Sequence, residues 1–181
     1  MRQAALQALE ASEVDLALGF FWKIEDRFLS RVLYEDDYAV VARDGHRGIR
    51  KRLTLEAYLN ACHIVVSFDG SVSGIVDRVL ARDGHSRKLV AAVPFFTTAL
   101  ATVARSDLIA TVPRRLAETL APLFGVQILE PPIMIRPYRV LVVWHERHDK
   151  SALHSWIIAE IEKCVAENAR GIGSKPLRSK G

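Results

Sequence analysis

Short runs of consecutive apolar residues alternate along the chain with segments in which apolar residues recur every three or four positions. The continuous runs are typical of buried strands, and the spaced pattern is typical of helices that pack one face on a sheet. Strands are predicted at 14–20, 28–34, 37–43, 63–68, 88–93, 108–112, 126–129 and 139–145. Helices are predicted at 2–13, 53–61, 72–83, 98–104, 114–123 and 151–170.

This alternation predicts an α/β fold with largely parallel sheets that are covered by helices. Ser71 is a candidate N-cap for helix 72–83, and Gly84 is its expected stop. The segments Asn60-Ala61-Cys62 and Glu130-Pro131-Pro132 interrupt the alternation and are hinge candidates. The Gly-, Ser-, Lys- and Pro-rich end of the chain, 171–181, is predicted to be a disordered basic tail.

Composition fits one globular domain or two small lobes, because half of the 181 residues are hydrophobic. No apolar run reaches the ~20 residues of a membrane helix, and no charged-then-apolar leader follows Met1. We therefore expect a cytoplasmic protein in which Cys62 and Cys164 are reduced. A net charge of +4 is too small to indicate a nucleic-acid surface.

Motifs for catalysis and cofactor binding are not found in the sequence. It contains no P-loop and no G-x-G-x-x-G, and Ser71-x-Ser73-Gly74 does not match a nucleophile elbow. The set that comes nearest to a metal site is His145-x-x-His148-Asp149 with His154. We interpret it as a solvated strand end, and we expect no enzyme activity, no cofactor and no metal.

Five segments, in order, resemble one family. The segment VPFFTTALATVARSDLIATVPRR, 93–115, matches most closely, and further similarity lies at 9–19, 53–67, 138–149 and 151–161. Together they resemble the effector-binding domain of LysR-type transcriptional regulators over roughly residues 4–169. In that family the block at 93–115 forms one wall of an inducer cleft.

The resemblance implies two Rossmann-like lobes joined by two crossing segments, as in periplasmic binding proteins. Residues 1–62 and 130–170 are expected to form a discontinuous lobe I, and 63–129 an inserted lobe II. The family's helix-turn-helix and the first strand and helix of the effector domain are expected upstream of this sequence. The first lobe therefore looks truncated, and the chain looks like a fragment, a truncated reading frame or an effector half without its DNA-binding half.

A ligand is expected beyond the carboxyl ends of the strands, where helix starts offer N–H donors and a partial positive charge that suit a carboxylate. Phenylalanines there provide apolar walls, and serine and threonine hydroxyls add donors. The candidate ligand-binding residues are Phe20, Phe21, Ser67, Phe68, Ser71, Pro94, Phe95, Phe96, Thr97, Val112 and Pro113, with His63 and Thr98 as further members. The alternatives are plain core for the phenylalanines and His63, and a capping role for Ser71.

Three function classes follow. The first is a regulatory domain that senses a small aromatic or apolar carboxylate in an interlobe cleft. It would contact DNA only through a helix-turn-helix outside this sequence, as a possible homo-oligomer with no membrane role. The second is a stand-alone cytoplasmic small-molecule binding module. The third, an enzyme, lacks any supporting set of residues.

Overall fold

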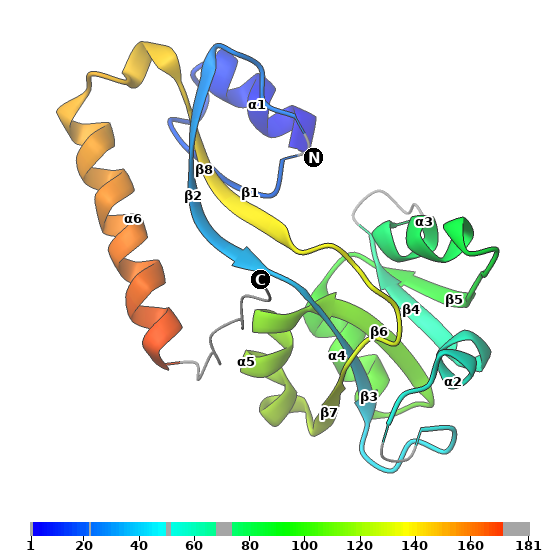
Figure 1. Ribbon diagram of the computed structural model, residues 1–181. Helices are drawn as coiled ribbons and strands as arrows, with labels where there is room; N and C mark the ends of the chain where they lie inside the picture. The colour runs from blue at the N-terminus through cyan, green and yellow to red at the C-terminus, as the bar shows by residue number, and fades with distance from the viewer. Residues whose placement is uncertain (1, 22, 50–51, 68–73, 172–181) are drawn as a thin grey trace, which may run out of the picture. The chain divides into compact units, whose positions relative to one another are not determined.

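The computed structural model describes residues 2–21, 23–49, 52–67 and 74–171. The chain divides into two compact units (Figure 1), a discontinuous unit of Met1–Glu35 with Tyr138–Gly181 and an inserted unit of Asp36–Pro137. No helix in the described part of the chain combines the length and the apolar character that crossing a membrane requires.

The discontinuous unit is built on a three-stranded sheet in the order β1-β8-β2. Its elements are α1 (Arg2–Glu10), β1 (Ala17–Gly19), β2 (Phe28–Asp36, whose last residue crosses into the inserted unit), β8 (Tyr138–His145), η1 (Glu146–His148) and α6 (Ala152–Gly171). The central strand β8 alternates its side chains between the two faces. Val143 packs with Leu9 of α1, whereas Val142 and Trp144 pack with Ile158 of α6, so one helix covers each face (Figure 1).

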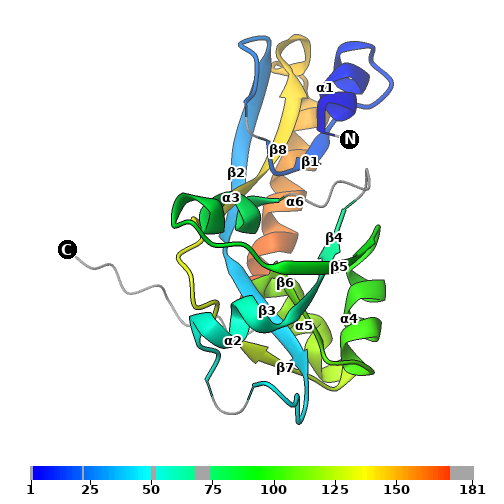
Figure 2. The ribbon, with the colours of Figure 1, turned by 90° about the vertical axis from the view of Figure 1, so that its right-hand side faces the viewer.

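The inserted unit has a five-stranded sheet in the order β5-β4-β6-β3-β7 (Figure 2). Its elements are β3 (Tyr38–Arg43), α2 (Leu55–Asn60), β4 (Cys62–Val66), α3 (Ile75–Arg82), β5 (Lys88–Val93), α4 (Phe96–Ala104), β6 (Leu108–Pro113), α5 (Arg114–Phe124) and β7 (Val126–Leu129). Both faces of this sheet are buried. Ala39 and Val41 of β3 face the core under α4 and α5, and Val40 and Ala42 face the core under α2 and α3.

Local signals explain several element ends. Thr54 accepts a hydrogen bond from the N–H of Ala57 through its side chain and begins α2. Gly125 ends α5 in the left-handed conformation, with φ 65° and ψ 42°. Gly84 follows α3 with φ +73°, as expected for a stop.

The α/β class is confirmed, and the predicted strands at 14–20 and 139–145 belong to one discontinuous unit as expected, because β8 pairs with β1. The expectation of largely parallel sheets is wrong. β4 runs parallel to β5 and β6, but β3 runs antiparallel to β6 and β7, and β1 antiparallel to β8.

The structure also corrects the lobe boundaries expected at 62/63 and 129/130. The units divide at 35/36 and 137/138 instead. The reason is strand pairing and packing: β3 and β7 hydrogen-bond into the inserted sheet, and Tyr58 of α2 lies in its core. The predicted tail at 171–181 begins with Gly171, the last residue of α6, and otherwise falls outside the described residues.

Candidate functional site

The carboxyl ends of β4 and β5 lie side by side at one edge of the inserted sheet, because the two strands are parallel neighbours. The N–H of Ser67, just after β4, donates to the carbonyl of Val93, the last residue of β5, at 2.9 Å. Pro94 follows Val93 and leads directly into α4. The structure thus brings together Ser67 and the predicted segment that begins at Pro94.

The start of α4 has no side-chain cap. Its N-cap is Phe95, whose extended backbone (φ −127°, ψ 140°) precedes the first turn and whose side chain makes no cap hydrogen bond. The Phe95 ring is 61% exposed. Thr97 and Thr98 are also exposed, whereas Phe96 packs partly against the core. First-turn N–H groups and an exposed hydroxyl are hydrogen-bond donors, and an exposed aromatic ring is an apolar surface.

The second predicted helix start, at α5, is already occupied by an acid of the chain. Asp36 accepts a hydrogen bond from the N–H of Arg115 at 3.3 Å through its carboxylate, and it also accepts from the N–H of Asp37 at 2.9 Å. Arg114 pairs with Asp37 and Glu130. A ligand carboxylate at Pro113 would be repelled by the carboxylates of Asp36, Asp37 and Glu130. Val112 is fully buried in the core under α4 and α5, so its side chain has no access to a ligand.

His63 is a buried core histidine. Its Nε2 lies 2.7 Å from the carbonyl of Tyr58, and the two rings meet edge to face at 4.6 Å. Burial lowers the pKa of His63 to about 4, so the ring is neutral at physiological pH. The Tyr58 hydroxyl, in turn, hydrogen-bonds the Thr111 hydroxyl at 2.9 Å. The alternative interpretation of His63 as core is the one that its burial supports.

A partly buried ion pair that the sequence did not suggest joins α3 to the segment before β5. The guanidinium of Arg87 binds the carboxylate of Asp77, and Asp77 also accepts from the N–H of Gly74. Asp77 stands three positions after the N-cap of α3, which is the capping-box position and was the available signal. Arg87 showed no signal, because a charged residue before a strand looks like an ordinary loop residue.

Phe20 and Phe21 belong to the discontinuous unit. The ring of Phe20 meets that of Tyr138 edge to face at 5.6 Å. Phe21 packs partly against the core around Leu9 and Phe28. Two further predicted residues, Phe68 and Ser71, lie outside the described residues.

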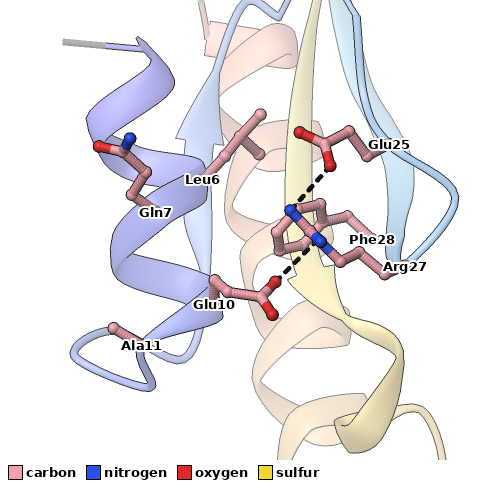
Figure 3. Close-up of a pocket in the computed structure, with 7 residues that line it drawn as sticks. All are labelled: Leu6, Gln7, Glu10, Ala11, Glu25, Arg27 and Phe28. Atoms are coloured by element: carbon pink, nitrogen blue, oxygen red, sulfur yellow. Dashed lines mark ion pairs between the residues drawn. The ribbon is translucent and has the colours of Figure 1, made fainter.

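Two surface hollows occur elsewhere. One, of about 200 Å³, is lined in part by an ion-pair cluster: Arg27 pairs with Glu10 at 2.8 Å and with Glu25 at 2.7 Å (Figure 3). Its lining residues are Leu6, Gln7, Glu10, Ala11, Glu25, Arg27 and Phe28. The other, of about 670 Å³, lies between residues 52–55 and 128–132. Neither hollow includes the start of α4. The charged side chains in the first hollow, Arg27, Glu10 and Glu25, pair with one another (Figure 3).

Metal-ligating side chains gather at one place in the described residues. Asp15, His148 and His154 bring one ligand atom each to within 4.8 Å of one another. His145, which the sequence grouped with them, turns to α1 instead: its Nε2 lies 3.5 Å from a carboxylate oxygen of Glu10.

Comparison with known proteins identifies the family of the chain. The sequence profile described as the LysR substrate binding domain matches residues 1–164. The HTH-type transcriptional activator NahR of Pseudomonas putida is 32% identical over 152 residues, which are 84% of this chain and 51% of NahR. The chain spans about half the length of the curated relatives it matches.

Solved structures agree. The crystal structure of PA0477 from Pseudomonas aeruginosa has a TM-score of 0.79 at 32% identity, covering 87% of this chain and 52% of that chain. The effector binding domain of QuiR in complex with shikimate has a TM-score of 0.69 at 16% identity, covering 91% of this chain and 75% of that chain. The order of strands and helices, the profile match and these neighbours together lead to one conclusion: the chain belongs to the LysR substrate-binding domain family.

Proposed function

We propose that the chain is the inducer-sensing part of a transcriptional regulator, and that the start of α4 binds the carboxylate of a small aromatic or apolar inducer. The observation that carries the proposal is the open first turn of α4. Phe95 cannot cap it, Thr97 offers a hydroxyl, and the Phe95 ring stands 61% exposed beside it. The inducer's carboxylate would accept hydrogen bonds from the first-turn N–H groups and from the Thr97 hydroxyl. The ring or aliphatic chain of the inducer would pack on Phe95.

The ligand class draws support from two sources. The acid that caps α5, Asp36, leaves α4 as the helix start better suited to an anion at this edge of the sheet. The effector binding domain of QuiR, which shares the fold, has been solved in complex with shikimate, and this supports the carboxylate part of the proposal.

We further propose that DNA is contacted through a helix-turn-helix in the full-length protein, as the names of relatives such as NahR indicate, and that the protein works in the cytoplasm as a homo-oligomer. The alternative is a stand-alone binding module. The coding sequence upstream of Met1 separates the two: an in-frame helix-turn-helix supports the regulator, and a stop codon directly upstream supports the stand-alone module.

Calorimetric titration tests the site. The chain is titrated with a panel of aromatic and aliphatic carboxylates and with the matching amides. We expect carboxylates to bind more tightly than amides. Thr97→Val should weaken carboxylate binding by roughly 1–2 kcal/mol through a lost charge-assisted hydrogen bond. Thr102→Val is the matched control on the same helix, because its hydroxyl donates to the carbonyl of Thr98 on the exposed side.

The outcomes are distinct. Equal loss in Thr97→Val and Thr102→Val would point to a general effect on α4 and contradict a contact at Thr97. Unchanged affinity of every bound carboxylate in Thr97→Val would move the site elsewhere. Amides that bind as tightly as the carboxylates would refute the anionic class.

A further inference from the structure

Three segments of the discontinuous unit meet where α6 begins. Asp15 lies between α1 and β1, His148 ends η1, and His154 lies in the first turn of α6. Their ligand atoms all lie within 4.8 Å of one another. We propose that Asp15, His148 and His154 bind a divalent transition-metal cation, with zinc as the ion. This site is independent of the ligand proposed at α4.

Ser151 orients the ring of His154. It is only 7% exposed, and its Nδ1 lies 3.0 Å from the hydroxyl oxygen of Ser151. The same oxygen accepts the backbone N–H of His154 at 3.4 Å. When that oxygen also accepts Nδ1–H, the Nε2 atom keeps its lone pair. Orientation of a histidine through its other ring nitrogen is the usual support of a metal ligand.

The Nε2 atom of His154 lacks a hydrogen-bond partner among the described residues, although it is buried. It faces the carboxylate of Asp15, with Oδ1 at 3.6 Å. A buried polar atom without a partner costs free energy, and a cation between this nitrogen and the carboxylate would satisfy both.

His148 completes the set. Its ring stacks on that of His154, with centroids 4.3 Å apart and planes 6° from parallel. Two imidazoles and one carboxylate, with a water at the fourth position, match zinc better than magnesium or calcium, which prefer oxygen ligands.

Binding requires a side-chain rotation, because a metal lies in the plane of each imidazole that binds it and the two stacked rings are only 6° from parallel. The His148 ring has to turn out of the stack to direct a nitrogen at the same ion as His154. Metal–ligand distances of about 2.0–2.2 Å place tetrahedral ligand atoms roughly 3.3 Å apart, so the donors have to close by on the order of 1 Å. The Asp15 side chain is 76% exposed and is able to make that approach. The bound cation would join the chain before β1 to η1 and α6, so it would stabilise the discontinuous unit.

The test uses the untagged chain 1–181, stripped with a chelator and titrated with zinc or cobalt. We expect one equivalent of zinc by calorimetry and the visible absorption of tetrahedral cobalt. At a hundredfold excess of free zinc over the dissociation constant, the Tm should rise by roughly 5–10 °C.

Asp15→Asn and His148→Gln should each lower the affinity for zinc at least tenfold. Removal of a residue that only hydrogen-bonds a metal ligand already lowers metal affinity by about 10–100-fold. Both side chains lie outside the buried core, and circular dichroism verifies that the variants fold. The controls His85→Gln and Cys164→Ser alter exposed residues away from the site and should bind as wild type.

Three results would overturn the proposal. One is the absence of saturable zinc binding by the chain. Another is binding that survives both Asp15→Asn and His148→Gln. The last is binding that disappears in Cys164→Ser or His85→Gln.

Discussion

Asp77 and Arg87 form a two-pronged ion pair, with Nε to Oδ1 at 2.8 Å and Nη2 to Oδ2 at 2.9 Å. The Arg87 side chain is only 3% exposed. Burial by itself would raise the pKa of Asp77, but the hydrogen bonds from Arg87 and from the N–H of Gly74 outweigh it and hold the pKa below its ordinary value. The pair therefore ties the start of α3 to the segment before β5 while both groups are charged.

Breaking this pair from the acid side should be costly. Asp77→Asn leaves the buried guanidinium of Arg87 without a counter-charge, and we expect the free energy of unfolding to fall by about 3–5 kcal/mol in urea titrations. Asp83→Asn, an exposed acid at the end of the same helix, should change it by less than about 0.5 kcal/mol. A similar small loss in both variants would show that the pair contributes little.

His63 should make stability fall with acid. Its pKa is about 4 in the folded chain, against 6.5 for an unperturbed histidine. Below pH 6.5 His63 becomes protonated in the unfolded chain, whereas in the folded chain it stays neutral down to about pH 4. The free energy of unfolding should therefore fall across this window by roughly 3 kcal/mol.

The measurement for His63 is urea titration at pH 7 and pH 4.5. His63→Leu should be less stable at pH 7, because the carbonyl of Tyr58 loses its partner, but should lose much less on acidification than wild type. His85→Gln, an exposed histidine, should keep the wild-type slope. The same slope in His63→Leu and wild type would assign the effect to other groups.

Gly125 should be sensitive to a side chain through its backbone alone. Its φ of +65° is left-handed, and an added Cβ would meet nothing within 4 Å. Gly125→Ala should therefore cost about 1 kcal/mol through strain, a drop of roughly 2–4 °C in Tm by calorimetry. Gly48→Ala is the control, since Gly48 is not left-handed and a Cβ there would make an ordinary contact with the His46 ring at 3.6 Å. Equal effects would contradict the backbone explanation.

The edge strand β1 should promote association. Among the described strands it pairs only with β8, and its Leu18 is 55% exposed. Unpaired edges with apolar side chains are templates for further strands. Leu18→Lys should shift sedimentation towards monomer with little change in Tm, whereas Leu123→Lys, at an exposed position on α5, should leave the distribution unchanged. An unaltered distribution in Leu18→Lys would exclude this edge.

The chain 1–181 should not bind DNA specifically. The substrate-binding profile accounts for residues 1–164, and a net charge of +4 supports only weak, salt-sensitive attraction. Fluorescence anisotropy with a random duplex pool should show binding that disappears at physiological salt. Enrichment of one sequence under those conditions would contradict the prediction.

Local features were predictable and distant ones were not. The strands at 88–93 and 126–129 agree to the residue with β5 and β7, because prolines and Gly125 mark their limits. The crossing at Asp36 was missed because Glu35 and Asp36, between two extended runs, look like a turn. In the structure Asp36 caps the start of α5, and the neighbouring Asp37 pairs with Arg114. The helix predicted at 98–104 is α4, which begins two residues earlier, at Phe96. The approach of Asp15 to His154 was not predictable, since only tertiary structure joins residues so far apart in the sequence.

The pairing of β1 with β8 has a consequence for synthesis on the ribosome. Ala17 finds its partner only when Val143 has left the exit tunnel, and α6 must follow before both faces of that sheet are covered. The inserted unit, 36–137, is continuous and is complete earlier. Its folding can therefore precede that of the unit that holds both ends, and the first strand must wait as an apolar segment that nascent-chain chaperones are able to protect.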